Sequence, residues 1–173
     1  MELLDKKVCM VVASSNFRDE EFLEPKKIFE DTGIKVVVAS SELGISKGYF
    51  GATANIDILV EDINVDEFDA IVFVGGSGSQ EYFNNPRALK IAKDAFDKNK
   101  TISAICIAPS ILANAGVLTN KRTTAFSSEK ANLTRNGAIW TGSSVEVDGN
   151  IITADGPGSA KEFGRAILNS LSK

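Results

Sequence analysis

The sequence predicts an α/β protein built on an open, mostly parallel β-sheet. The first indication is a set of short, continuous apolar runs, typical of parallel strands buried on both faces. These runs are residues 8–13, 34–39, 68–74 and 102–105. The second is that helical patterns alternate with the runs, as in right-handed βαβ units. The third is size, because 173 residues, 43% of them hydrophobic, suffice for one domain over residues 1–173 with a sizeable core.

The other elements follow from turn and helix signals in chain order. After a polar turn at 14–18 we expect a helix that has Pro25 near its start and ends at Gly33. Its apolar residues are Phe22, Leu23, Ile28 and Phe29. Residues 44–51 are expected to form a loop or a small hairpin. The remaining predicted elements are an extended piece at 56–60, a helix at 86–98, a helix after Cys106, a strand at 121–126, a helix at 127–135, an extended piece at 138–140, a hairpin of 144–147 and 151–154 that turns at Asp148-Gly149-Asn150, and a last helix at 159–171 opened by Gly156-Pro157-Gly158.

Composition argues against several classes of protein. The net charge is −4, from 19 basic and 23 acidic residues, and this disfavours nucleic acid or anionic lipid as the main partner. No apolar stretch reaches the roughly 18 residues of a transmembrane helix, and the N-terminus lacks the apolar core of a signal peptide. Two cysteines without a spacing pattern indicate neither a disulfide framework nor a zinc site. We therefore expect a cytoplasmic protein that holds no metal.

Cys106 is the first candidate for chemistry, because it lies on the turn between a buried strand and a helix. A helix N-terminus presents unpaired N–H groups and a positive dipole end, which favour a thiolate. A free cysteine is more often a small core hydrophobe, and Cys9, inside a predicted strand, is interpreted that way. The chain has no histidine, so chemistry at Cys106 has to proceed without an imidazole base.

A glycine-rich turn and an acidic cluster are the other candidates. Gly75-Gly76-Ser77-Gly78 matches no phosphate-binding motif; it is either a flexible turn or, beside a nucleophile, a source of oxyanion-binding N–H groups. The N–H of Ile107 would be the second donor. The carboxylates of Asp19, Glu20, Glu21 and Glu24 begin the first helix, where most such charges face water. One of them can point inward, and the pattern alone does not say which. The turns at 14–21, 75–78 and 106–107 should meet at the carboxyl edge of the sheet, where such folds bind ligands.

At these residues the sequence resembles the ThiJ/PfpI superfamily, which includes protein deglycases and PfpI-type intracellular peptidases, from about residue 7 to the C-terminus. The matching motifs are Ala104-Ile105-Cys106 with Pro109, Ala115-Gly116-Val117-Leu118, Phe68-Asp69-Ala70-Ile71-Val72 with Gly75-Gly76, Glu21 four residues before Pro25, Val147-Asp148-Gly149-Asn150, and Gly156-Pro157-Gly158-Ser159 with Glu162-Phe163.

The resemblance implies a flavodoxin-like, class I glutamine amidotransferase-like three-layer sandwich, a homodimer, and no cofactor. It also implies that Cys106 is a nucleophile on a strained elbow, that Glu21 is the acidic residue of the site, and that Gly76 and Ile107 donate to an oxyanion. Gly75 is a further candidate binding residue beside these.

Departures from the family pattern bear on activity. PfpI-type peptidases have histidine where this chain has Ile107, and deglycases often have histidine at Ala125 and arginine at Asp155. Asp155 occupies a candidate binding position but removes an anion-binding charge. Arg18 either supplies a cation instead or is an ordinary solvated arginine. Without histidine, peptide cleavage lacks its usual acid for the leaving amine.

Three functions remain open on these grounds. The favoured one is an enzyme that acts on small reactive carbonyls through a Cys106 thiolate and Glu21 as acid and base, like a glyoxalase or deglycase. The Glu21 carboxyl should then titrate unusually high, as one member of a coupled pair. The second is an oxidative-stress sensor or stress-response protein that works through oxidation of Cys106. The third is a scaffold that has lost its chemistry.

Overall fold

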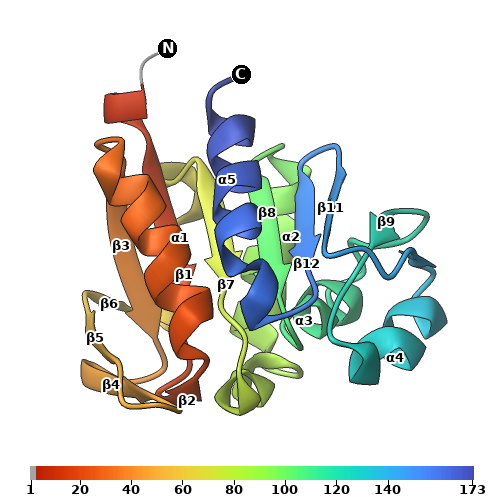
Figure 1. Cartoon of the computed structure of the whole chain (residues 1–173), viewed down its shortest axis with the longest axis horizontal. Helices are drawn as coiled ribbons and strands as arrows, with labels where there is room; N and C mark the ends of the chain where they lie inside the picture. Colours follow the sequence, from red (N-terminus) through yellow and green to blue (C-terminus); the bar gives the residue numbers. More distant parts are fainter. Residues whose placement is uncertain (1–2) are drawn as a thin grey trace.

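A seven-stranded, mostly parallel sheet forms the centre of the computed structural model, which describes residues 3–173 (Figure 1). Its strand order is β11-β12-β8-β7-β1-β3-β6, and only β11 runs antiparallel to its neighbour. The bounds of these strands are β1 Lys7–Val11, β3 Lys35–Ser40, β6 Ile58–Leu59, β7 Ala70–Phe73, β8 Thr101–Ile105, β11 Val145–Asp148 and β12 Ile151–Ala154. The sequence prediction of a mostly parallel sheet is confirmed.

The central strands are apolar throughout because both of their faces are covered. In β1, Cys9 pairs in register with Val37 of β3 and Ile71 of β7, and all three lie in the core. Strands β7 and β8 are likewise buried at every position. The predicted core strands are therefore confirmed, and so is the interpretation of Cys9 as a core residue.

Helices cover both faces of this sheet. Figure 1 shows α1 (Asp19–Asp31) and α5 (Ala160–Leu171) side by side in front of it, with α2 (Pro86–Asp97) and α3 (Pro109–Asn114) behind. Each face has its own hydrophobic cluster. The three-layer arrangement implied by the resemblance is thus present. No helix within residues 3–173 has both the length and the apolar character needed to cross a bilayer.

Helix α1 packs through a narrow stripe formed by Phe22, Pro25 and Phe29, which are all buried. Leu23 was expected in the same apolar face, but its side chain is 46% exposed. One residue along a helix turns the side chain by about 100°, and this carries Leu23 off the stripe. The helix ends at Thr32 and Gly33, whose positive φ of 85° is readily adopted only without a side chain.

The region from 121 to 140 differs most from the prediction. The strand expected at 121–126 shrinks to β9 (Arg122–Thr123), which pairs with β10 (Ile139–Trp140) outside the main sheet. The chain leaves strand pairing after Thr123 because the next N–H, of Thr124, donates to the Thr153 hydroxyl and that of Phe126 to the Cys106 carbonyl. The helix expected at 127–135 is split into a 3₁₀ turn and α4 (Lys130–Arg135).

Two hairpins complete the fold. The antiparallel pair β11–β12 confirms the hairpin predicted around Gly149. At 44–51, left open between a loop and a hairpin, the chain forms β4 (Gly44–Gly48), which pairs antiparallel with β5 (Thr53–Ile56). This hairpin also pairs with β2 (Ser15–Phe17) in a separate three-stranded sheet at the lower edge in Figure 1.

Candidate active site

The three predicted turns meet because the strands that precede them, β1, β7 and β8, are neighbours in the sheet. The backbone N–H of Arg18, just before α1, donates to the carbonyl of Gly75, just after β7, at 2.9 Å. A Cβ added to Gly75 would lie 2.5 Å from the Ile105 carbonyl oxygen and 2.7 Å from the Cys106 Cβ. The carboxyl edge of the sheet therefore brings the candidate residues together, as expected.

Cys106 occupies a strained elbow. Its φ is +64°, which is uncommon for a residue with a side chain. The backbone is fixed on both sides, since the Cys106 N–H donates to the Ala154 carbonyl at 3.0 Å and the Cys106 carbonyl accepts from the Phe126 N–H at 2.8 Å. The thiol is partly exposed, unlike that of Cys9.

Glu21 lies behind the thiol with its side chain completely buried. Neither of its carboxyl oxygens has a partner of good hydrogen-bond geometry among residues 3–173, although the Cys106 thiol and the Gly75 N–H lie close enough to lower its pKa. A side chain on Gly75 would collide with one of these oxygens, so the absence of a Cβ there makes room for the carboxyl next to Cys106. A buried polar group with no partner is costly, and such groups gather at functional sites.

The acidic cluster sends its three adjacent carboxylates to three different places. Asp19 turns toward the β4–β5 hairpin and accepts from the N–H groups of Phe50 at 2.9 Å and Ala52 at 2.7 Å. Glu20 forms an ion pair with Arg18 at 2.6 Å. Only Glu21 points to the cysteine, which agrees with the choice implied by the family resemblance.

The protonation of the pair is governed by burial. Burial raises the pKa of the Glu21 carboxyl from 4.5 to about 8, while the Cys106 thiol and the Arg18 charge act in the opposite direction. The high titration predicted for Glu21 is confirmed in direction. Because the two groups share one site, the first proton lost near pH 8 belongs to the pair.

The expectation of a lowered thiol pKa is wrong. Burial, with the Glu21 charge adding to it, raises the pKa of the Cys106 thiol to about 12. The backbone N–H groups of Gly76 and Ile107 lower it by less. One reason is that α3 begins only at Pro109, so Cys106 stands ahead of the helix rather than in its first turn.

Gly76 and Ile107, the two expected oxyanion donors, both lie beside Cys106 and line the same cavity. Their N–H groups both act on the Cys106 sulfur, and neither donates to a backbone carbonyl within residues 3–173. Gly76 has φ +99°, and a Cβ there would lie 2.7 Å from the Asn16 carbonyl oxygen. Only glycine fits this position, so the turn is specified rather than merely flexible.

An open cavity of about 390 Å³ gives access to the thiol. The residues around it include Arg18, Tyr49, Gly76, Cys106, Ile107 and Phe126. Asp155, a predicted binding residue, does not line this cavity. Its carboxylate instead accepts a 2.6 Å hydrogen bond from the Ser159 hydroxyl at the start of α5.

Sequence reasoning missed the aromatic rim of this cavity. Tyr49 lines it from the tip of the β4–β5 hairpin, and the ring of its neighbour Phe50 meets the Tyr49 ring edge to face at 5.0 Å. Both side chains are 64% exposed. A signal was present, since two adjacent aromatic residues between glycines 48 and 51 are unusual for a solvent-exposed turn.

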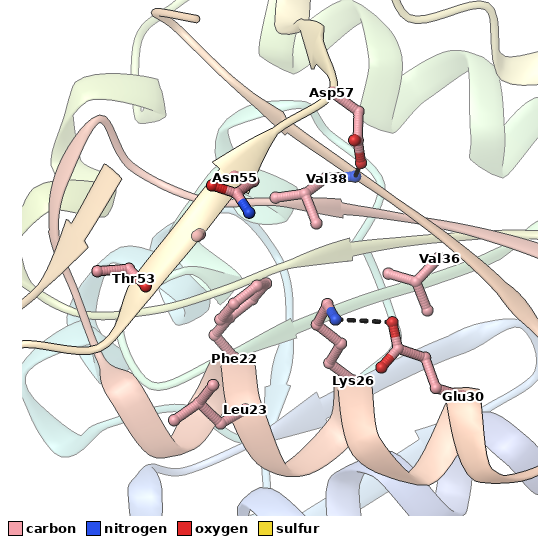
Figure 2. Close-up of a pocket in the computed structure, with 10 residues that line it drawn as sticks. Phe22, Leu23, Lys26, Glu30, Val36, Val38, Thr53, Asn55 and Asp57 are labelled. Atoms are coloured by element: carbon pink, nitrogen blue, oxygen red, sulfur yellow. Dashed lines mark hydrogen bonds and ion pairs between the residues drawn. The ribbon is translucent and has the colours of Figure 1, made fainter. Parts of the chain in front are cut away.

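A second hollow, of about 320 Å³, is not a site of the same chemistry. Figure 2 shows it between α1 and the strands β3 and β5, with Lys26 paired to Glu30 at 2.6 Å. Neither Cys106 nor Glu21 lines it. Within residues 3–173 no three Cys, Asp or Glu side chains converge as metal ligands would.

Comparisons with known proteins agree with this geometry. The DJ-1/PfpI family model matches residues 6–170. An uncharacterized protein of Methanocaldococcus jannaschii is 42% identical over 170 residues, which cover 96% of this chain and 83% of that protein. A protein named as a deglycase in Pyrococcus abyssi is 34% identical over 162 residues, covering 94% of this chain and 98% of its own. The crystal structure of a ThiJ/PfpI domain protein from Brachyspira murdochii superposes with a TM-score of 0.94 at 37% identity, covering 96% of each chain. The fold is accordingly the flavodoxin-like one that the resemblance implied.

Proposed function

Since the chain belongs to the DJ-1/PfpI family, we propose that it is a cysteine-dependent enzyme acting on small reactive carbonyl compounds. The deglycase name of a relative supports a DJ-1-like deglycase or protease type of function. The observation that carries the narrower proposal is the fully buried Glu21 carboxyl beside the partly exposed Cys106 thiol.

The first step is addition of the thiol to a 2-oxoaldehyde such as methylglyoxal. The sulfur bonds to the aldehyde carbon while Glu21, as the carboxylate, takes the thiol proton. The N–H groups of Gly76 and Ile107 stabilise the developing oxyanion, which then takes up a proton to give a hemithioacetal.

The second step is an internal redox shift. Glu21 removes the proton from the former aldehyde carbon and returns one to the neighbouring carbonyl carbon, so the hemithioacetal becomes a thioester of a 2-hydroxy acid. Water then cleaves the thioester and restores the thiol. Methylglyoxal and water thus give lactate, with no external oxidant or reductant.

The absence of histidine favours this reaction over peptide cleavage. No amine has to leave, so no imidazolium is needed to protonate one. The alternative of an oxidation sensor needs a thiolate at neutral pH, and burial opposes this by raising the pKa of Cys106.

The test is incubation of the pure protein with methylglyoxal and measurement of lactate. We expect turnover whose kcat/KM rises with pH toward about pH 8, where the pair loses its first proton. Cys106→Ala should abolish lactate formation, whereas Cys9→Ala, the matched change at the buried cysteine, should retain it. Lactate formation that is absent in wild type, or equal in Cys106→Ala, would refute the proposal.

A further inference from the structure

The guanidinium of Arg18 is fixed at the cavity that leads to Cys106. Its Nε donates to Glu20 Oε2 at 2.6 Å, and its Cζ stands 4.8 Å from the centre of the Phe50 ring. No other hydrogen bond joins the guanidinium to residues 3–173, so the terminal nitrogens Nη1 and Nη2 remain available to a ligand. A cation held over an aromatic face keeps its orientation, which a free surface arginine does not.

The groups that hold Arg18 are themselves anchored. The Phe50 N–H is bound to Asp19, and the Arg18 N–H to the Gly75 carbonyl, so backbone contacts fix both partners of the stack. This arrangement favours the interpretation of Arg18 as a cation placed at the cavity.

Arg18 carries the only positive charge among the residues that line the cavity. Glu20 offsets part of it, but both side chains of this ion pair are about a third or more exposed, at 34% and 41%, and the pair is screened by water. A substrate that enters the cavity therefore meets an arginine with free donors and the Cys106 thiol, while the Glu21 carboxyl lies buried behind that thiol and does not itself line the cavity.

We propose that Arg18 selects substrates that carry a carboxylate, namely 2-oxoaldehydes whose far end is a carboxylate group. This inference rests on the proposed function. The terminal nitrogens of a guanidinium match a carboxylate in shape and bind it more strongly than a neutral acceptor. For 4,5-dioxopentanoate, Cys106 would add to the aldehyde carbon while Arg18 holds the distant carboxylate. The same hydrogen shift and thioester hydrolysis then consume one water and give 2-hydroxyglutarate.

The first test compares kcat/KM for 4,5-dioxopentanoate and for methylglyoxal. We expect wild type to prefer the anionic substrate and Arg18→Gln to lower the ratio of the two kcat/KM values about tenfold or more, mainly through a higher KM for 4,5-dioxopentanoate. Loss of the Arg18 charge also acts on the pKa of Glu21, but this affects both substrates alike and cancels in the ratio. Arg18→Lys should keep part of the preference. Arg165→Gln, an exposed arginine on α5, is the matched control and should change neither value. Equal losses for both substrates in Arg18→Gln would overturn the proposal.

A second test does not depend on turnover. Iodoacetate and iodoacetamide alkylate a thiol in the same way and differ in charge, so the ratio of their rates at Cys106 reports anion attraction. We expect Arg18→Gln to lower the iodoacetate-to-iodoacetamide ratio several-fold, and Glu20→Gln to raise it because the competing carboxylate is gone. An unchanged ratio overturns the role of Arg18. A lowered ratio in a protein that turns over neither aldehyde refutes the proposed reaction but supports anion selection by Arg18.

Discussion

At the scale of single residues, the burial of the Glu21 carboxyl determines how it and the Cys106 thiol titrate. It is fully buried, and burial outweighs the neighbouring Cys106 thiol and Arg18 charge that would stabilise its anion, so its neutral form is favoured. When it does ionise, near pH 8, its negative charge lies beside the Cys106 sulfur and opposes formation of the thiolate. The two groups therefore exchange one proton more easily than they lose two.

This coupling predicts the behaviour of Glu21→Gln. Glutamine keeps the shape of the side chain but cannot carry its charge. The pKa of the Cys106 thiol should therefore be lower in the variant than in wild type, and the difference should show above pH 8, where Glu21 is ionised in wild type. At pH 9 we expect iodoacetamide to alkylate Cys106 on the order of tenfold faster in the variant than in wild type. Peptide mass spectrometry measures the alkylation of Cys106 separately from that of Cys9. Glu20→Gln, one residue away on the same helix, is the control and should change the rate much less. A slower reaction in Glu21→Gln would contradict the coupling.

At the scale of elements, the β4–β5 hairpin is joined to the start of α1 by Asp19. The two carboxylate oxygens each accept one hairpin N–H, from Phe50 and Ala52. The close approach also requires Gly48, since a Cβ there would lie 2.6 Å from an Asp19 oxygen. The hairpin tip and its aromatic rim are thereby fixed to the helix that carries Glu21.

Asp19→Asn should loosen this junction. The asparagine amide oxygen can accept one of the two hydrogen bonds, from Phe50 or Ala52, but the amide NH2 then faces the other backbone N–H. One hydrogen bond is lost, and two donors face each other in a repulsive contact. We expect a loss of about 1–3 kcal/mol in the free energy of unfolding, measured with urea, and faster proteolysis at the hairpin. Asp31→Asn, the same change at the exposed end of the helix, serves as control and should leave both unchanged. An Asp19→Asn protein as stable as wild type would show that the hydrogen bonds of Asp19 to the hairpin do not stabilise the fold.

Elements that depend on their own sequence were predictable, and those fixed by distant partners were not. The apolar runs of β1, β7 and β8 are specific enough to predict the central strands of the sheet. Because Gly76 and Cys106 directly follow two of these runs, their position at the carboxyl edge of the sheet could be predicted as well. The prediction of a strand over residues 121–126 is wrong because the N–H groups of Thr124 and Phe126 donate to Thr153 and Cys106, which are distant in the sequence. The acidic cluster could not be resolved from pattern for the same reason. Three like residues in a row diverge only because the hairpin, Arg18 and Gly75 lie on different sides of them.

At the scale of the whole molecule, the buried acid makes folding stability depend on pH. The native state holds the Glu21 proton up to about pH 8, whereas an unfolded chain releases it near 4.5. Between these values the native state binds more protons, so the free energy of unfolding falls as pH rises. The chain has no histidine, so no other side chain of ordinary pKa titrates in the middle of this window.

We therefore expect wild type to lose up to about 4 kcal/mol of stability between pH 5 and pH 8, measured by urea unfolding at several pH values. Glu21→Gln, which is neutral at every pH, should flatten the profile and be the more stable protein at pH 8. A wild-type profile that is flat or rises over this range would mean that Glu21 is ionised throughout.

The attachment of the aromatic rim to a hairpin, rather than to the sheet that holds the sulfur, has a practical consequence. Tyr49 lines the cavity from this hairpin, whereas the strands that precede Gly76 and Cys106, β7 and β8, belong to the seven-stranded sheet. A combinatorial library at residue 49 should therefore change which molecules the cavity admits while the backbone around Cys106 stays as it is.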